Sequence, residues 1–310
     1  MLLTGANGFI GSWALEALGD RGYEVHAVSS RPGEGSPRAE WHLADLLQAE
    51  TSEALVAGVR PDLLLHLAWY AEHGRFWASI ENVRWVEATL RLLRAFAKHG
   101  GRRAVIAGTC AEYEWTAEGG ICSEEETLRP KTLYGVSKNA TRAVAQALAE
   151  EAGFELAWGR IFLLYGPGEA ETRIVPSVAR ALLEGTPAAV GEGSQIRDFL
   201  HVGDVGEAFV ALLESDAQGA VNIGSGEGVA LREVVELVAR ATGRPELVQF
   251  GAVESRADEP AALVADVRRL TEEVGFRPRI SLADGIAETV AWWRERLGNG
   301  VVGGGRRAER

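Results

Sequence analysis

The sequence predicts an α/β fold, in which a doubly wound parallel sheet is followed by a smaller α/β lobe. Two features of the chain indicate it. Short apolar runs alternate with amphipathic helical stretches through the first two-thirds of the 310 residues, as expected for successive strand–helix units of a parallel sheet. After Tyr165, glycine-rich segments break the chain into shorter pieces, which suits a second lobe.

Each element of this fold has its own signal. Apolar runs bounded by turn residues predict buried strands at 24–30, 62–69, 103–109 and 155–162. Helical periodicity that ends at glycine predicts helices within 11–22, 84–100 and 134–153. Periodicity also predicts the later helices, near 174–184, 203–214, 230–242 and 283–296.

A glycine-rich turn follows the short apolar start of the chain. The segment TGANGFIG places Gly5, Gly8 and Gly11 between the first strand and the first helix. Glycine lets backbone amides approach a pyrophosphate, and the N-terminal end of a helix favours its negative charge. The segment therefore predicts a dinucleotide-binding turn.

Composition argues against several other classes of protein. The formal net charge of -12 disfavours binding to nucleic acid or to an anionic membrane, since both require a basic surface. The chain shows neither an apolar stretch long enough to span a membrane nor a signal-peptide pattern at its start. We therefore expect a cytoplasmic protein.

The cysteines and histidines predict neither disulfides nor metal sites. Cys110 and Cys122 are too few for a disulfide framework and lack the spacing of metal ligands, so both are expected to be reduced thiols. The six histidines are scattered, with no pair at i, i+4. No metal site is expected on that basis.

The segment TLYGVSK places Tyr134 four residues before Lys138. Only three of the 32 Lys and Arg residues are lysines, so chance would supply such a pair with an expectation of roughly 0.05. At this spacing the two side chains share one face of a helix. A nearby cation lowers the pKa of a phenol, which is about 10 when free, toward the range useful for proton transfer.

The glycine turn and the Tyr134–Lys138 pair together resemble the extended short-chain dehydrogenase/reductase superfamily, in its NAD-dependent epimerase/dehydratase family of nucleotide-sugar enzymes. The resemblance covers about residues 1–298. It implies a Rossmann-type NAD(P)-binding domain over 1–165 plus about 199–215, and a substrate-binding lobe over about 166–198 and 216–298. The glycine-rich segment 299–310 is expected to be a disordered tail.

The resemblance also implies a catalytic set. Thr109 stands 25 residues before Tyr134, as in nucleotide-sugar members of the family, and would hydrogen-bond the reacting oxygen. Tyr134 would exchange the proton, while Lys138 would hold the cofactor ribose and lower the pKa of the phenol. Asn82 resembles a supporting asparagine of the family.

One reaction of the family is disfavoured by the residues after Thr109. In its 4,6-dehydratases this threonine is followed by Asp and Glu, the acid and base that move water out of the sugar. Here Cys110 and Ala111 occupy those places, and neither can replace the pair. Glu112 follows one residue later and is expected to point elsewhere.

The cofactor is predicted to be a nicotinamide dinucleotide. Ser29, Ser30 and Arg31 follow the second strand and offer hydroxyls and a cation in place of an acidic residue, which favours NADP(H) and leaves NAD(H) possible. The resemblance implies cofactor contacts at Gly5, Asn7, Gly8, Phe9, Ile10, Gly11, Ser29, Ser30, Arg31, Asp45, Leu46, Leu67, Ala68, Tyr134 and Lys138.

The second lobe resembles the substrate-binding part of nucleotide-sugar enzymes. Arg197 and Arg256 match arginines that clamp a substrate diphosphate, a role that suits the bidentate guanidinium. Tyr165 is a further candidate substrate contact. For each arginine, the alternative is an ion pair with a nearby acidic residue.

Several functions remain open at this point. The leading hypothesis is an NADPH-dependent reductase of a nucleotide-linked 4-keto-6-deoxyhexose, because GSQIRDF (193–199) and FGAVESRADE (250–259) resemble 6-deoxyhexose 4-ketoreductases. The alternative is a nucleotide-hexose 4-epimerase that retains NAD+. A reductase of a non-nucleotide carbonyl compound and a non-catalytic dinucleotide sensor are less favoured. The family commonly forms homodimers through two helices per subunit, here those near 81–99 and 134–153.

Overall fold

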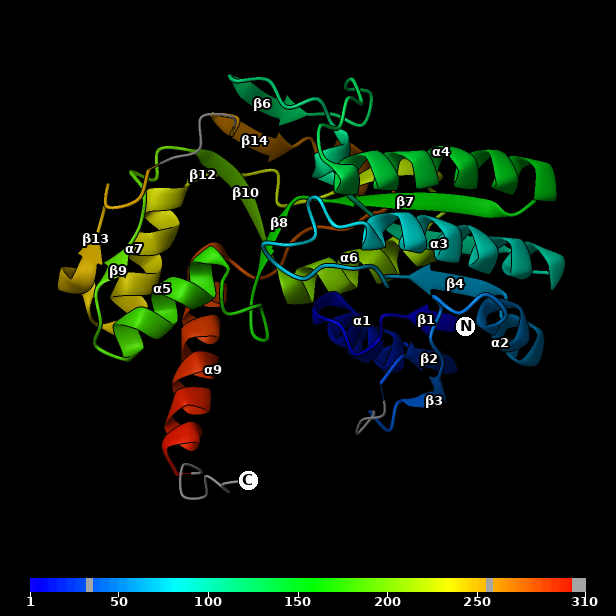
Figure 1. Ribbon diagram of the computed structural model, residues 1–310, viewed down its shortest axis with the longest axis horizontal. Helices are drawn as coiled ribbons and strands as arrows, with labels where there is room; N and C mark the ends of the chain where they lie inside the picture. The colour runs from blue at the N-terminus through cyan, green and yellow to red at the C-terminus, as the bar shows by residue number, and fades with distance from the viewer. Residues whose placement is uncertain (32–35, 255–258, 303–310) are drawn as a thin grey trace.

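The computed structural model describes residues 1–31, 36–254 and 259–302, and of 299–302 only the backbone. Its main element is a seven-stranded sheet in which each strand is parallel to its neighbours (Figure 1). In spatial order the strands are β11 (Gly219–Ile223), β7 (Glu155–Ile161), β5 (Arg103–Thr109), β4 (Leu63–His66), β1 (Leu2–Thr4), β2 (Val25–Ser29) and β3 (Ala39–Leu43).

Helices cover both faces of this sheet (Figure 1). One face packs against α1 (Phe9–Asp20) and α6 (Val202–Glu214) through a core of mainly small and aliphatic side chains together with Phe209. The opposite face packs against α2 (Thr51–Val59), α3 (Glu81–Lys98) and α4 (Leu133–Ala152). Alternation of side chains along each strand separates the two cores.

The smaller lobe has a mixed five-stranded sheet and its own core. The sheet contains β6 (Gly119–Cys122), β14 (Ala262–Ala265), β10 (Ile196–His201), β12 (Gly228–Ala230) and β8 (Leu163–Tyr165). The remaining elements are the helices α5 (Ile174–Leu183), α7 (Leu231–Thr242), α8 (Arg268–Glu272) and α9 (Leu282–Val302), the short strand pair β9 (Ala188–Ala189) and β13 (Val248–Gln249), and the 3-10 turns η1 (Cys110–Glu112) and η2 (Pro245–Leu247).

The fold class predicted from the sequence is confirmed, including the four early strands and the main helices. The predicted division of the chain differs from the observed sheets at two elements. β11 lies within the predicted substrate lobe but pairs with β7 in the large sheet, because its apolar run is buried there. β6 lies within the first 165 residues but pairs with β14 of the smaller sheet.

Two further features bear on the ends and surface of the chain. α9 continues to Val302, so the predicted tail begins with helical residues, and its remainder, 303–310, lies outside the described residues. Among the described residues, every helix falls short of the combined length and hydropathy that crossing a membrane requires.

Candidate functional site

The glycine turn between β1 and α1 is closed so tightly that side chains do not fit. A Cβ on Gly5 would lie 2.8 Å from the amide nitrogen of Ala68, and one on Gly11 would overlap the carbonyl oxygen of Gly5. Gly5 also has a φ of +72°, which favours glycine. The N-cap of α1 is Gly8, which has no side chain to engage the first amides, so these amides can bind a phosphate.

A buried polar chain supports this turn from below. Thr4 Oγ1 lies 2.6 Å from His66 Nδ1, and His66 Nε2 lies 3.0 Å from Thr89 Oγ1. Burial, assisted by the charge of Lys138, lowers the pKa of His66 to about 3. A neutral imidazole therefore joins β1, β4 and α3 beneath the turn.

The predicted adenosine contacts lie at the C-terminal ends of β2 and β3. The Asn7 side-chain amide donates to Ser29 Oγ at 3.0 Å, and Ser29 Oγ donates to the carbonyl oxygen of Arg31 at 2.9 Å. Asp45 accepts from the amide of Leu47 at 3.0 Å. These bonds fix the backbone next to the glycine turn, while Ser30 and Arg31 remain exposed.

Tyr134 and Thr109 meet although they are 25 residues apart. Thr109 ends β5, and Tyr134 lies in the first turn of α4, whose N-cap Thr132 accepts from the amide of Gly135. Burial raises the pKa of Tyr134 above that of a free tyrosine, and a hydrogen bond with Thr109 opposes the rise. The protein alone therefore does not lower the pKa of this phenol, in contrast to the expectation from the Tyr–Lys spacing.

Lys138 lies one turn after Tyr134 and is buried. Its Nζ donates to the carbonyl oxygen of Ala107 at 2.8 Å and lies 3.8 Å from the centroid of the Trp69 ring. Burial lowers the pKa of Lys138 to about 7, against the opposing charge of Glu112. The ammonium is thus held at the carboxyl end of β5 by a carbonyl and an aromatic face.

Asn82 supports this arrangement through Trp69. Its Oδ1 accepts from Trp69 Nε1 at 2.9 Å, and its Nδ2 donates to the carbonyl oxygens of Phe76 and Ser79 at 2.7 and 2.8 Å. The segment that Asn82 holds also carries Trp77, whose ring lies edge-on to Tyr134 at 5.7 Å between centroids. Asn82 therefore acts by positioning the neighbours of Tyr134 and Lys138.

Glu112, for which the sequence indicated only that it points elsewhere than the dehydratase pair, points into the core. Its carboxylate accepts from the amide of Thr109 at 2.9 Å, from Trp158 Nε1 at 2.8 Å and from Arg160 Nε at 2.9 Å. The side chains of Glu112 and Arg160 are 0% and 2% exposed. The carboxylate is therefore committed to an ion pair and to the position of Thr109.

The positions that would carry an acid–base pair for dehydration hold inert side chains. Cys110 and Ala111 are both buried in the 3-10 turn after β5. Burial raises the pKa of the Cys110 thiol to about 12. A thiol in that state does not exchange protons near neutral pH.

The predicted substrate residues have three different placements. Arg197 is buried in β10, donates to the carbonyl oxygens of Ile196 and Pro260 at 2.9 Å each, and lies 3.5 Å from a carboxylate oxygen of Glu259. Tyr165 is 1% exposed, in the core of the smaller lobe. Arg256 lies outside the described residues.

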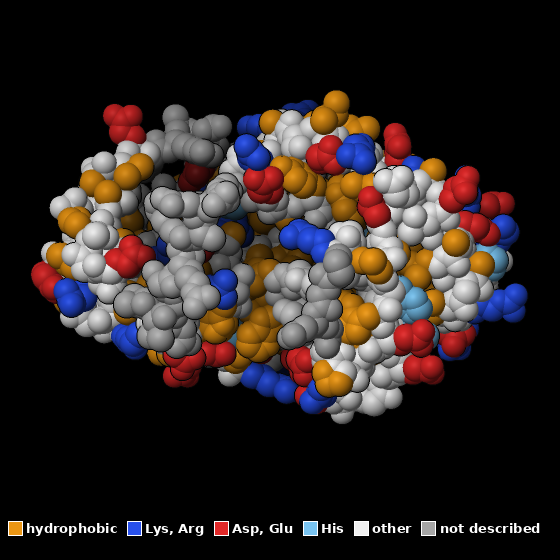
Figure 2. Space-filling view, turned by 60° about the horizontal axis from the view of Figure 1, so that its bottom comes forward, with side chains coloured by type: hydrophobic (Ala, Val, Ile, Leu, Met, Phe, Trp, Pro, Cys, Tyr) orange, Lys and Arg blue, Asp and Glu red, His pale blue; other side chains and the backbone are white. Residues whose placement is uncertain are grey.

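A depression of about 200 Å³ in the smaller lobe adjoins Arg197 through Glu259. It contains an apolar wall of Ile174, Val190, Val235 and Phe250. On the surface between the two lobes, apolar and basic side chains gather around a central hollow (Figure 2). The segment after Tyr165 reaches the start of α1, since a Cβ on Gly168 would lie 3.9 Å from Phe9.

Sequence reasoning missed several residues that build this region. Asp198 is fully buried and accepts from the backbone of Ser225, Gly226 and Ala265, so it fixes the loop after β11. His66 and Trp69 were treated only as parts of a strand and its end. Their partners lie far away in the sequence, so spacing along the chain carries no signal for these contacts.

Comparisons with known proteins show the family to which the chain is related. The sequence model of the NAD dependent epimerase/dehydratase family matches residues 1–224. The dTDP-glucose 4,6-dehydratase of Streptomyces griseus is 30% identical, with 95% of this chain and 94% of that protein covered. The UDP-glucose 4-epimerase of Mycolicibacterium smegmatis is 28% identical, covering 95% and 98%.

Solved structures show the same relationship. The protein MoeE5 in complex with UDP-glucose and NAD is 32% identical, with a TM-score of 0.81 and coverage of 96% of this chain and 99% of that one. The UDP-glucose 4-epimerase of Thermus thermophilus in complex with NAD is 29% identical, with a TM-score of 0.83 and coverage of 94% and 98%. The chain belongs to the NAD-dependent epimerase/dehydratase family, and it is an enzyme of the extended short-chain dehydrogenase/reductase type.

Proposed function

We propose that this protein is an NAD-dependent 4-epimerase of a nucleotide-activated hexose. The observation that carries the proposal is the site itself, which joins Thr109 and Tyr134 next to Lys138 but has Cys110 and Ala111 where dehydration would need an acid and a base. Epimerisation at C4 needs only hydride transfer and proton transfer. It is therefore the reaction of these relatives that the residues fit best.

The glycine turn and the strand ends fit a nicotinamide dinucleotide. At Gly5 and Gly11 the turn closes on its own backbone, where a Cβ would collide, and Gly8 leaves the first amides of α1 without a side-chain cap, so these amides can bind a ligand phosphate. When bound, NAD+ would accept the C4 hydride and return it, and the positive charge of its ring would lower the pKa of Tyr134. Lys138 would move its ammonium from the Ala107 carbonyl to the ribose hydroxyls.

The protein side chains would handle the proton. Tyr134 would take the proton of the C4 hydroxyl as the hydride leaves and give it back when the hydride returns. Thr109, whose hydroxyl lies close enough to Tyr134 to oppose the rise of its pKa, would orient the same sugar oxygen. Glu112 would keep Thr109 in place through its backbone amide.

The smaller lobe would hold the nucleotide part of the substrate. The depression beside Glu259 offers an apolar wall for a base, and Arg197 together with Arg256 would bind the diphosphate. To bind the diphosphate, Arg197 would have to release the carboxylate of Glu259, which lies 3.5 Å from its guanidinium. Tyr165 would act on the substrate only through packing, since its ring is buried.

A second candidate is the NADPH-dependent 4-ketoreductase. It is favoured by one observation, namely that Ser29, Ser30 and Arg31 follow β2 without an acidic side chain that would repel a 2'-phosphate. Relatives that hold NAD, such as the Thermus thermophilus epimerase, support the epimerase better. The two candidates differ in whether reducing equivalents are consumed.

The test is to denature the purified protein, identify the released cofactor by mass spectrometry, and then supply UDP-, dTDP-, CDP- and GDP-hexoses. We expect retained NAD+ and interconversion of two C4 epimers without oxidation of added NADPH. Stoichiometric oxidation of NADPH by a 4-keto-6-deoxy nucleotide sugar, with no epimer formed, would contradict the proposal and favour the reductase.

We also propose that the active form is a homodimer assembled through α3 and α4. Val83 on α3 and Val136 and Val144 on α4 are 44%, 47% and 50% exposed. A groove of about 410 Å³ between these helices is lined by Leu90, Val144 and Leu148 together with charged side chains. The two helices lie side by side on the outside of the large sheet (Figure 1), where a second copy could cover them.

A further inference from the structure

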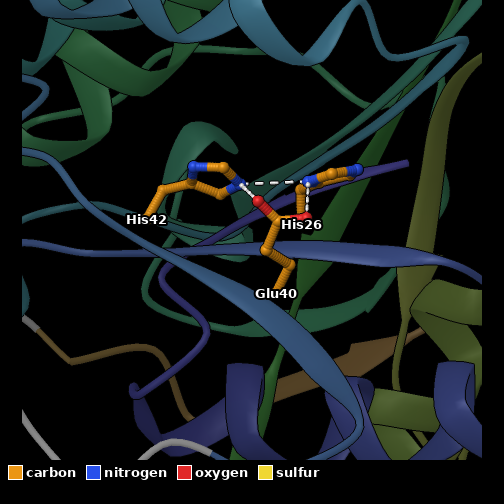
Figure 3. A group of neighbouring side chains, drawn as sticks. All are labelled: His26, Glu40 and His42. Carbon is orange, nitrogen blue, oxygen red and sulfur yellow. Dashed lines mark hydrogen bonds and ion pairs between the residues drawn. The ribbon is translucent and has the colours of Figure 1, made fainter.

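Two histidines and a glutamate converge on the edge of the large sheet, away from the glycine turn. His26 lies in β2, and Glu40 and His42 lie in the edge strand β3. The register of this parallel pair places His26 opposite Glu40 and Val28 opposite His42. The three side chains point toward one another (Figure 3).

The alternation of the two strands explains why they share one face. Val25, Ala27 and Trp41 pack on the side of α1, so the residues between them face the opposite side of the sheet. There the side chains of His26 and His42 are 16% and 24% exposed, and that of Glu40 is 69% exposed. The cluster is therefore held by backbone pairing but open to solvent.

The distances within the cluster suit a metal ion. His26 Nδ1 lies 3.0 Å from His42 Nε2, and the Glu40 carboxylate oxygens lie 3.6 Å from His26 Nδ1 and 3.8 Å from His42 Nε2. Ligands bound tetrahedrally at zinc–nitrogen distances of 2.0–2.1 Å are separated by about 3.3 Å. Small side-chain rotations would bring all three atoms to that separation.

We propose that His26, Glu40 and His42 form a Zn²⁺ site on the β2–β3 edge, with solvent as the remaining ligand. Two imidazoles and a carboxylate match the donor set that zinc uses. Neutral histidine binds through one nitrogen when its proton sits on the other. The exposed side chain of Glu24 lies 3.9 Å from His26 Nε2, beyond hydrogen-bond distance, and a rotation toward the ring would let it accept from the protonated nitrogen, an arrangement that orients metal-bound histidines.

This site is separate from the proposed catalytic centre, because β4 and β1 lie between β2 and β5, the strand that ends at Thr109. His26 precedes Ser29 by three residues along β2, a distance of about 10 Å along a strand. A bound ion would tie the edge strand β3 to β2 and stabilise the fold there. The sequence expectation of no metal site depended on spacing within one element, whereas His26 joins Glu40 and His42 only through the pairing of β2 with β3.

The test is titration of the full chain, freed of any affinity tag and treated with chelator, with ZnCl₂ by isothermal calorimetry. We expect one Zn²⁺ per chain. His42→Asn should lower the affinity for Zn²⁺ by at least about 100-fold, and Glu24→Gln, which removes only the supporting carboxylate, should lower it by about 10-fold. Glu40→Gln changes an exposed side chain and keeps the fold while weakening binding. Circular dichroism in chelator shows whether His42→Asn is folded.

The matched control is His99→Asn. His99 is also partly buried, at 18% exposure, and lies 2.8 Å from the carboxylate of Glu53, which also binds Lys98 Nζ at 2.6 Å, so this surface group contains one histidine and one glutamate. This variant should bind Zn²⁺ like the parent. The proposal is overturned if the parent binds no stoichiometric Zn²⁺, if Glu40→Gln and His42→Asn bind as tightly as the parent, or if the Co²⁺-substituted protein shows thiolate charge-transfer absorption, which would place the ion on cysteine.

Discussion

The buried ion pair between Glu112 and Arg160 provides the sharpest prediction about the site. Glu112→Gln keeps the size of the side chain and one carbonyl oxygen, which can still accept from Thr109 and Trp158. Its amide group would then face Arg160 Nε, and two donors would oppose each other. The guanidinium, 2% exposed, would remain charged without its carboxylate.

The expected cost is large because removal of one partner of a buried pair leaves an uncompensated charge, a loss of about 3–5 kcal/mol. Other contacts of Arg160, to Tyr113 Oη at 3.0 Å and the carbonyl oxygen of Glu124 at 3.1 Å, place the expectation near the lower end. We therefore expect Glu112→Gln to lower the free energy of unfolding by about 3 kcal/mol.

The assay is urea denaturation of the parent and the variant at pH 7, followed by fluorescence. The matched control is Asp62→Asn, which breaks the ion pair of Asp62 with Arg102; these side chains are 67% and 73% exposed. That control should change the free energy of unfolding by less than about 1 kcal/mol. A loss below about 1 kcal/mol for Glu112→Gln would refute the reasoning, since the pair would then behave like a surface one.

Three further predictions concern titration and assembly. The pKa of Lys138 is about 7 in the folded protein, below its usual value of 10.5, so between these pH values the unfolded chain binds more protons. The free energy of unfolding should therefore rise with pH by up to about 1.4 kcal/mol per pH unit. Lys138→Met should remove this slope, as measured by urea denaturation at pH 7 and 9. Burial, opposed by Arg173, raises the pKa of Glu169 from 4.5 to about 7, so the free energy of unfolding should fall as the pH rises from about 4.5 to about 7. Glu169→Gln should remove this fall and should be more stable than the parent at pH 8. Val144→Glu places a charge in the exposed groove between α3 and α4 and should convert the proposed dimer to a monomer in light scattering; a parent with the mass of a monomer, or a variant that keeps the mass of a dimer, would contradict the proposed interface.

The fold was largely predictable because its signals are local. Apolar runs predicted β2, β4, β5 and β7, and glycine spacing predicted the turn before α1. The exceptions have a physical reason. β6 and β11 are short, and which sheet each one joins is decided by partners far along the chain, β14 and β7.

The candidate site was predictable where chemistry is tied to spacing. Tyr134 and Lys138 both lie in α4, and Thr109 is the last residue of β5, close to the N-terminal end of α4. The polar chain through His66 and the Trp69 ring against Lys138 arise from packing between separate elements. The raised pKa of Tyr134 likewise depends on how deeply the phenol is buried, which spacing does not report.

The most direct test of the central claim follows the hydride at C4. The protein, with its own cofactor and no added NADPH, is incubated with a UDP-hexose that carries deuterium at C4, and both epimers are analysed by mass spectrometry. The account predicts that the deuterium remains at C4 of the epimerised sugar, because the same hydride leaves and returns within one site, and that Tyr134→Phe abolishes the conversion. Loss of the label to solvent, or conversion only when NADPH supplies the hydride, would contradict it.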